Sequence, residues 1–518
     1  MSASNRREFL ADVGRGMLSA AVGAGLAADM GLASVAAAAE AGAATKLDFG
    51  ALEPLVALMQ DTPPEKLLPL LVERIAKGTD LRTMTAAGAL ANARTFGGED
   101  YIGYHTFMAL APAYEMSKQM PKGREALPVL KVLHRNATRI QAHGGHASEK
   151  LRVIEPAALP SDRDGGELLQ ELVRKRDRDA AERAFAAMVD HDAGEAYHHL
   201  QFEIEDEVDV HRVVLSWRAW ATLDLVGREH AHTLLRQSVR YCLQSEQYLH
   251  ERNLQPSAIR TQLPKLFDQY KLAGKPLGTR RADDAWIEAF SKLVFGKSRE
   301  EAADAAAAAL AEGISPDSIG EAISVASNLL VLHDPGRAQA NTPDKPVGSC
   351  HGDSVGVHAS DSANAWRNIA KVSNARNTAA SLIVGAFHTA GQGNRLNKQP
   401  YPTAEQLSEI TNRDPAVLLR ELDGAVREKN QFRACALAAL YADGGAEVRP
   451  AFDLLLGFAT SEDGALHAEK YFRTCTEEYA TMRPAFRNRQ LAALARVSAS
   501  EFGKPAPGYV QAKELLKV

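Results

Sequence analysis

Beyond residue 50, apolar side chains recur with the period of an α-helix along almost the whole chain. The pattern places apolar residues at i, i+3, i+4 and i+7, which gives each helix one face that it can bury. It is clearest in residues 50–60, 64–78, 81–96 and 127–145. Alternating apolar and polar runs joined by tight Asn-Gly turns, which are typical of β-hairpins, are missing. The sequence therefore predicts an all-α protein.

Glycine and proline indicate where some of these helices begin and end. Gly78 and Gly313 directly follow helical stretches, where a C-terminal cap belongs, and Ser315-Pro316 fits the N-cap and first position of the next helix. Residues 151–167 and 333–354 are rich in Pro and Gly and are predicted to be loops. The second of them is either a functional loop or a surface insertion.

Segments of the second half of the chain repeat segments of the first half in the same order. Three histidines recur with them, as the pairs His105 and His358, His134 and His388, and His230 and His467. The first two histidines are 29 residues apart in one copy and 30 in the other. Apolar helical segments resemble one another by chance, so the main evidence for a true repeat is that its histidines recur in the same order.

The third pair comes from a short local match. GREHAHTLLR at 227–236 aligns with GALHAEKYFR at 464–473. In this alignment Arg236 matches Arg473, while His232 is replaced by Glu469. The match favours His230 over His232 as a functional residue.

This repeat predicts an internal duplication, with two similar multi-helix halves packed about a pseudo-twofold axis. We expect the first helical half at residues 50–255, the second at 280–500 and a C-terminal tail at 501–518. The copies would differ by an insertion of about seventeen residues, which falls in the 151–167 loop.

Composition narrows the classes of function. The chain has 518 residues, of which 45% are hydrophobic and 24% charged, as is usual for a globular protein. A net charge of -5 and no dense stripe of Lys and Arg argue against nucleic-acid binding. The four cysteines include no Cys-x-x-Cys pair and form no disulfide framework. No run of 18 strongly apolar residues exists, so we expect no membrane span in the mature chain.

The amino terminus carries a recognisable targeting pattern. Arg6 and Arg7 precede Phe9 and Leu10, and a weakly apolar Gly/Ala stretch follows, with small residues near positions 34–39. This resembles a twin-arginine (Tat) export signal, although Asn5 stands where Ser is more usual. The resemblance implies a signal peptide at residues 1–40, a partner in the Tat export machinery, and a periplasmic or extracellular protein that crosses the membrane folded.

Histidine and carboxylate side chains are the candidates for chemistry. Neutral imidazole and carboxylate suit iron, zinc, copper or manganese, so we expect a transition metal ion between the helices. The expected metal ligands are His105, His134, Glu195, His198, His388, His467 and Glu469. The expected catalytic residues are His230, His358, Arg236 and Arg473.

Each of these residues also has a structural interpretation. Glu195 and His198 form a Glu-x-x-His step, as Glu229 and His232 do, and di-metal bundles use such steps; chance also produces them in a chain of this composition. A lone histidine on an apolar stretch, such as His134, is often a hydrogen-bonded core residue. No Walker lysine loop and no Gly-x-Gly-x-x-Gly after a strand supports nucleotide binding.

The body of the chain resembles large Tat-exported helical bacterial proteins without an assigned activity. The resemblance runs through residues 194–212, 228–242, 351–377 and 466–497. Residues 312–330 are faintly similar to a helical pair of the carboxymuconolactone-decarboxylase-like fold, but the Cys-x-x-Cys of its peroxidases is absent. Neither resemblance supplies a mechanism.

Two functions follow as hypotheses. The first is an exported metal-dependent enzyme, an oxidoreductase acting on a small molecule, with histidines and acids of both halves around a central cavity. The second is an exported helical binding or scaffold protein, in which the histidines serve packing and capping.

Overall fold

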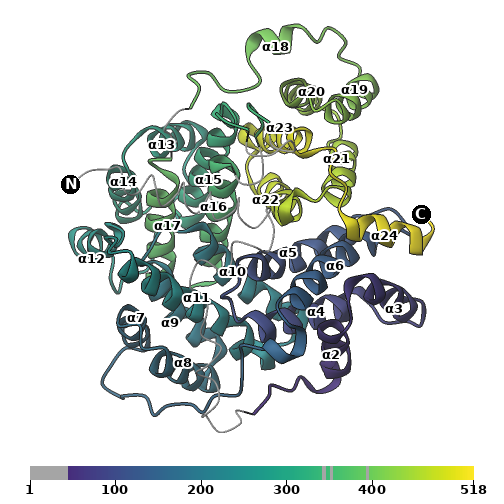
Figure 1. The fold of residues 1–518 in the computed structure, drawn as a ribbon. Coiled ribbons are helices and arrows are strands. Elements are labelled where there is room, and N and C mark those ends of the chain that lie inside the picture. The colour runs from purple at the N-terminus through teal and green to yellow at the C-terminus, as the bar shows by residue number, and fades with distance from the viewer. Residues whose placement is uncertain (1–44, 341–345, 351–353, 393–395) are drawn as a thin grey trace.

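The computed structural model describes residues 45–340, 346–350, 354–392 and 396–518. Within these ranges it contains 23 α-helices and short 3-10 helices, and no β-strand (Figure 1). Two isolated β-bridges, Arg280 with Ile314 and Glu462 with Pro505, are the exceptions to helical structure and loops. The all-α prediction is confirmed. The predicted export signal lies outside the described residues.

The first half of the chain forms a continuous series of helices. They are η1 (Gly50–Leu52), α2 (Glu53–Asp61), α3 (Pro64–Ala76), α4 (Leu81–Phe96), α5 (Tyr101–Ser117), α6 (Leu127–Ala142), η2 (Gly145–Ser148), α7 (Gly165–Arg174), α8 (Arg178–His191), α9 (Ala193–Ile204), α10 (Val210–Val226), η3 (Arg228–His230), α11 (Ala231–Glu251) and α12 (Ile259–Tyr270).

A second series follows. It comprises α13 (Asp284–Gly296), α14 (Arg299–Ala311), α15 (Pro316–His333), α16 (Val355–Val372), α17 (Ala375–Thr389), α18 (Ala404–Ser408), α19 (Pro415–Arg427), α20 (Gln431–Asp443), α21 (Arg449–Ser461), η4 (Gly464–Leu466), α22 (His467–Thr481), α23 (Pro484–Glu501) and α24 (Pro507–Leu516). The stretch expected to be only a tail thus contains a helix.

Local sequence explains where many helices begin and end. Asp80 and Asp209 are N-caps whose carboxylates accept the backbone N–H of the third helical residue, which satisfies a donor that the helix leaves free. Ser315 caps α15 with Pro316 at its first position, as predicted. Gly78 and Gly313, with φ of +100° and +85°, adopt the left-handed conformation that favours glycine after a helix.

Two groups of three successive helices form the centre of the molecule. In one, α4, α5 and α6 pack against one another, and in the other α15, α16 and α17 do the same. Helices α10 and α22 connect the groups, because each of them packs against both α5 and α16 (Figure 1). The residues that α5, α10, α16 and α22 direct toward one another are therefore brought together from distant parts of the sequence.

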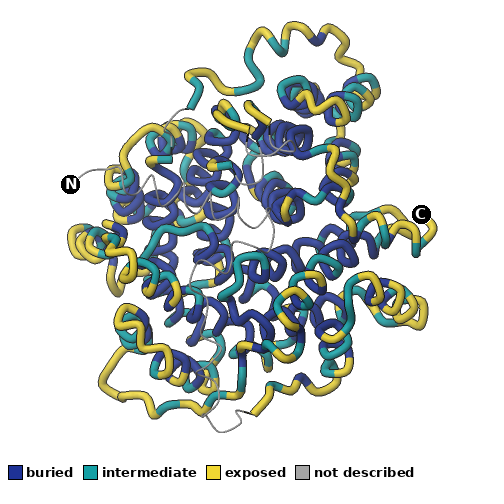
Figure 2. Tube along the Cα trace, viewed as in Figure 1, coloured by how far each residue is buried: buried dark blue, intermediate teal, exposed yellow. Residues whose placement is uncertain are grey.

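Burial is concentrated in these central helices, while α3, α12, α18 and α19 carry much of the exposed surface (Figure 2). Buried apolar side chains form two clusters. The larger joins α2–α12 to α13–α17, and the smaller lies mainly between α19 and α23. The main core therefore crosses the expected boundary between the halves.

The helices α12 and α24 pack far from the elements that precede them. Helix α12 lies against α14 and α17, while α24, at the end of the chain, lies against α3 and α6. Helix α12, from the first series, therefore packs on two helices of the second series, and α24, from the second series, packs on two helices of the first.

No helix in the described ranges combines the length and the apolar character that crossing a bilayer requires.

Candidate functional site

Four histidines from four helices meet at the centre of the molecule. They are His105 on α5, His211 on α10, His358 on α16 and His467, the first residue of α22. Their ring centroids form a closed circuit, 4.7 Å from His105 to His211, 5.8 Å from His211 to His358, 5.2 Å from His358 to His467 and 5.3 Å from His467 to His105. We call these four residues the histidine cluster.

The cluster is largely closed to solvent. His105, His211 and His467 are 3%, 4% and 3% exposed, while His358 is half-buried. Burial lowers the pKa of His105 well below its ordinary value, and Lys470 and His211 lower it further. The pKa of His467 falls well below its ordinary value for the same reasons, since burial, Lys470 and His358 all act on it. Both imidazoles are therefore neutral near pH 7, the form that offers a nitrogen lone pair.

Two of the imidazoles are oriented by groups behind them. Nδ1 of His105 lies 2.7 Å from the carbonyl oxygen of Tyr101. Because a carbonyl only accepts, Nδ1 carries the proton and Nε2 the lone pair. Nδ1 of His211 faces Asp209, 3.6 Å from its Oδ1. The Nε2 atoms of both histidines are buried without a hydrogen-bond partner.

Asp209 is held firmly in the position that orients His211. Its Oδ1 accepts hydrogen bonds from the backbone N–H of Arg212 at 2.9 Å and from the hydroxyl of Tyr241 at 2.8 Å. Burial raises the pKa of Asp209, but His211, Tyr241 and the backbone N–H of Arg212 outweigh it and hold the pKa below its ordinary value. A carboxylate behind an imidazole is the arrangement that commonly orients a metal-binding histidine.

The other two imidazoles bind each other instead. Nε2 of His358 and Nε2 of His467 are 3.1 Å apart, so one N–H donates to the other ring. Nδ1 of His467 is buried without a hydrogen-bond partner. Among the described residues, no carboxylate or carbonyl therefore orients the ring of His467.

Aromatic side chains cover the side of His105 and His211. The ring of Tyr104 is stacked on His105 with centroids 5.1 Å apart and lies 5.5 Å from His211. Tyr101 lies 4.3 Å from His105, and Tyr241 contacts Tyr104 at 5.3 Å. These tyrosines exclude water from that side.

Charged side chains also lie near the cluster, on α10, α16 and α22. Lys470 and Asp361 are 3% and 5% exposed, and burial lowers the pKa of Lys470 to about 8 against the opposing effect of Asp361. Asp361 accepts a hydrogen bond of 2.8 Å from Thr474, and burial raises its pKa. Arg218 on α10 is 5% exposed and also acts electrostatically on Asp361.

The donor set of the cluster is suited to transition metals. Four imidazoles match zinc, copper, iron or nickel and offer none of the oxygen ligands that calcium or magnesium requires. As the side chains stand, however, no group of three or more His, Cys, Asp or Glu residues in the described part of the chain is arranged to hold a metal ion. The described side chains would have to turn to bind one.

Three of the sequence-predicted residues, His105, His358 and His467, are brought together here. The sequence had paired His105 with His358, and these two lie across the circuit from each other.

The other predicted histidines lie outside the cluster, each with a local partner. His134 on α6 lies against Gly508 of α24. Trp366 donates a hydrogen bond of 3.2 Å to Nδ1 of His388, and burial lowers the pKa of His388 to about 4. His230 is half-buried in η3 and contacts the edge of Phe49 with ring centroids 5.6 Å apart.

The predicted carboxylates and arginines also make separate contacts. Glu195, with a side chain 62% exposed, lies 3.6 Å from Nδ1 of His198 at the surface. Glu469 is buried and lies 2.6 Å from Nζ of Lys131. Arg236 pairs with Glu182, and Arg473 pairs with Glu477 at 2.6 Å.

His211 is the member of the cluster that our sequence-based prediction omitted. It follows the helix-capping Asp209 by two residues at the start of α10. An Asp-x-His sequence at a helix start was a usable signal, because the cap fixes the carboxylate beside the imidazole.

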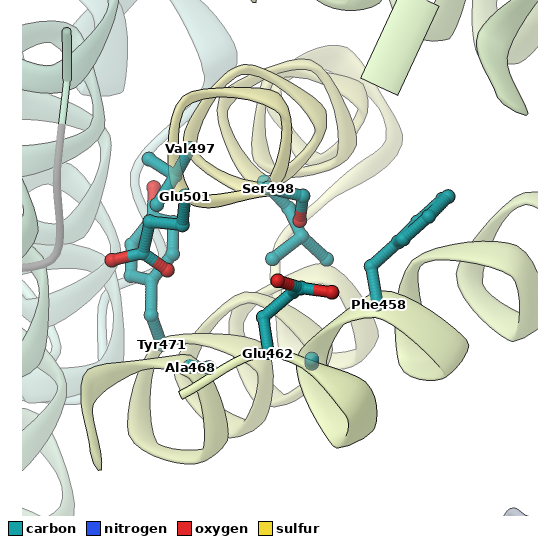
Figure 3. A pocket seen from close by; sticks show the side chains of 9 residues that line it. Phe458, Glu462, Ala468, Tyr471, Val497, Ser498 and Glu501 are labelled. Carbon is teal, nitrogen blue, oxygen red and sulfur yellow. The ribbon is translucent and has the colours of Figure 1, made fainter. Parts of the chain in front are cut away.

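A small cavity lies beside the cluster's helix α22, between α21 and α23 (Figure 3). Its volume is about 10 Å³, and Glu462, Tyr471, Ser498 and Glu501 are among the residues that line it. A space of this size holds about one water molecule. It is therefore too small for an organic substrate.

Comparisons with known proteins add no relative. No protein-family description matches the chain, and neither curated proteins nor solved structures gave a match. The function must therefore be argued from the site itself.

Proposed function

We propose that the protein is an exported, metal-dependent oxidoreductase whose transition metal ion is held by the histidine cluster. The observation that carries this proposal is the pair of buried, unpartnered Nε2 atoms of His105 and His211 beside the His358–His467 contact. A buried nitrogen without a partner costs about 1–3 kcal/mol, so an ion that accepts both lone pairs would recover that cost.

The spacing of the rings supports this donor set. Imidazole nitrogens bind zinc at about 2.0–2.1 Å, so two nitrogens on one tetrahedral ion are roughly 3.3 Å apart and their ring centroids about 5 Å apart. The Nε2 atoms of His358 and His467 are 3.1 Å apart, and the four centroid distances run from 4.7 to 5.8 Å. Rotation of the side chains would still be needed to bring the four donors around one ion.

The number of ligands favours redox chemistry. Sites that activate water usually have three protein ligands and one open position, whereas four protein ligands fill a tetrahedral ion. An ion held by four imidazoles has no open position for a substrate, so it would act by changing its oxidation state or serve only to stabilise the fold. Copper and iron change oxidation state in proteins, whereas zinc does not.

Metal analysis tests the proposal. Apoprotein is loaded with copper(I), iron(II) or zinc under nitrogen, desalted and analysed for metal; we expect about one equivalent bound. The variant His211→Ala should lose the metal, while His230→Gln, outside the cluster, should keep it. Less than about a tenth of an equivalent in folded wild-type protein would contradict the proposal.

Export rests on the sequence of the amino terminus. The Arg6-Arg7 pair ahead of a weakly apolar stretch supports translocation by the Tat machinery and a location outside the cytoplasm. Replacing both arginines with lysine should retain the protein in the cytoplasm. Normal export of this variant in cell fractionation would contradict the proposal.

We further propose that the molecule consists of two copies of one helical unit about a pseudo-twofold axis. Matching contacts support this: α4, α5 and α6 pack as α15, α16 and α17 do, and α24 lies on α3 and α6 as α12 lies on α14 and α17. Likewise α10 packs on α16 as α22 packs on α5. In this arrangement His105 corresponds to His358, and the matching positions of α10 and α22 make His211, rather than the His230 of the sequence alignment, the counterpart of His467.

A second candidate function is an exported binding or scaffold protein with structural histidines. It is favoured by the absence, in the described ranges, of any three donor side chains already arranged for a metal ion. The metal analysis separates the two functions, because a scaffold would keep its fold and bind no stoichiometric metal.

A further inference from the structure

Two buried cations next to the histidine cluster lack the partners that buried cations normally have. Lys470 and Arg218 are 3% and 5% exposed. Neither makes an ion pair within 4.0 Å or a side-chain hydrogen bond with a residue that the structure describes, and Nε of Arg218 is buried without a partner. Leaving a buried charge uncompensated is strongly unfavourable.

The remaining buried lysines and arginines show how unusual these two are. Each of the others in the described ranges makes an ion pair or donates a hydrogen bond, and they are Arg94, Lys131, Arg212, Arg236, Arg240, Arg367 and Arg496. The fold therefore supplies partners for buried cations everywhere except beside the cluster.

The nearby carboxylates are already engaged. Asp361, which acts on both cations, accepts a hydrogen bond from Thr474. Glu469 lies against Lys131, and Glu477, which acts on Arg218, pairs with Arg473. Glu501, which is 8% exposed, also acts on Lys470. Lys470 and Arg218 therefore have the carboxylates of Asp361 and Glu501 near them but no ion pair within 4.0 Å in the described part of the chain, so each lacks a direct counterion. In addition, Nδ1 of His467 is buried and unpartnered on this side.

We propose that Lys470 and Arg218 form a binding site for a small anion beside the histidine cluster, of the size of a carboxylate such as formate. Lys470 supplies the charge and Arg218 a planar donor suited to carboxylate oxygens. Because α22 carries His467 and Lys470 one helical turn apart, the anion would lie next to the cluster.

If the proposed oxidoreductase is correct, this inference names its substrate class, a small anion or an organic acid presented through its carboxylate. The naming of the substrate rests on the proposed function, whereas binding of the anion does not require a metal. The two are therefore tested separately.

The experiment uses full-length apoprotein treated with a chelator. Sodium formate is titrated at constant ionic strength and followed by calorimetry and by the midpoint of thermal unfolding. We expect saturable binding of one formate and a rise in the midpoint. Lys470→Met and Arg218→Met should each weaken binding at least about tenfold. Lys292→Met, at a lysine on α13 with a side chain 66% exposed, should bind as the wild type does.

Folding of the variants is checked independently. Lys470→Met removes a buried charge that has no direct ion-pair partner among the described residues, so this variant should unfold at a temperature no lower than the wild type. The Lys470→Met result therefore decides the test even if Arg218→Met does not fold. Absence of saturable formate binding, or unchanged binding in Lys470→Met, would overturn the anion site. Formate binding without any metal binding would refute the proposed oxidoreductase and leave the anion site intact.

Discussion

The two sides of the histidine cluster are built differently. On one side His105 and His211 are oriented from behind by a backbone carbonyl and by Asp209, and tyrosines cover them. On the other side His358 and His467 bind each other, and Lys470 lies close to His467. On the first side, the Nε2 atoms of His105 and His211 are free to bind a ligand. On the second side, the Nε2 atoms of His358 and His467 would first have to break their mutual hydrogen bond.

This difference predicts separate roles in metal binding for the two pairs of histidines. Donors that are already oriented need little reorganisation to bind an ion, so His105 and His211 would anchor it. His358 and His467 would complete the site only after their mutual hydrogen bond breaks. Lys470 acts electrostatically on His467 and also on His105, so it would attract an anion to the cluster.

The largest expected effect separates these two sides directly. His211→Ala removes an oriented ligand and should weaken metal binding by about 1000-fold or more, measured by competition with a chelator. His467→Ala removes a donor that must first give up a hydrogen bond and should cost about tenfold to 100-fold. Equal losses of metal affinity in His211→Ala and His467→Ala would show that the two sides of the cluster do not differ in metal binding.

A second pair of variants compares two buried lysines near α22, one with an ion-pair partner and one without. Lys131 on α6 pairs with the buried Glu469, so Lys131→Met leaves that carboxylate uncompensated and should lower the free energy of unfolding by about 3 kcal/mol. Lys470→Met should not lower it, because no carboxylate loses an ion-pair partner. Denaturant unfolding measures the free energy of unfolding of both variants. A similar decrease in Lys131→Met and Lys470→Met would contradict the predicted difference between the two lysines.

Sequence patterns predicted the helices well because helix signals are local. Periodicity, the Ser315-Pro316 start and the glycines at 78 and 313 act within one or two turns. The cluster depends instead on how α5, α10, α16 and α22 cross, which no local pattern encodes. The repeat identified His105 and His358, but it could not place them beside His211.

The match between 227–236 and 464–473 shows why the remaining histidines were harder to place. Gly227 precedes the 3-10 turn η3 and Gly464 begins η4, and both have positive φ. The local similarity is only partial, because Ala465 and Leu466 in η4 are also left-handed, whereas no residue of η3 is. The turns lead into different places, since His467 enters the cluster while His230 lies against Phe49. The backbone geometry of the turn was repeated only in part, and its tertiary surroundings were not repeated.

The role of Asp209 gives a smaller effect. Asp209→Asn keeps the helix cap but removes the negative charge behind His211, and loss of such a partner typically weakens metal affinity about tenfold to 100-fold. We expect a loss of metal affinity near tenfold, because the amide oxygen of the introduced Asn still accepts a hydrogen bond. Chelator competition with His230→Gln as control measures it, and an unchanged affinity would mean that Asp209 does not orient the ligand.

The smallest effect is expected at His230. Because its half-buried ring contacts Phe49 outside the cluster, His230→Gln should change the free energy of unfolding by less than about 1 kcal/mol and leave metal affinity unchanged. Loss of metal in this variant would mean that the site extends beyond the four clustered histidines.

X-ray absorption spectroscopy of the metal-loaded protein tests the central claim most directly. If the cluster holds the ion, the fine structure should fit about four imidazole nitrogens at roughly 2.0 Å, and His211→Ala should remove one of them or abolish binding. A metal bound through sulfur, or through fewer than two imidazoles, would contradict the account.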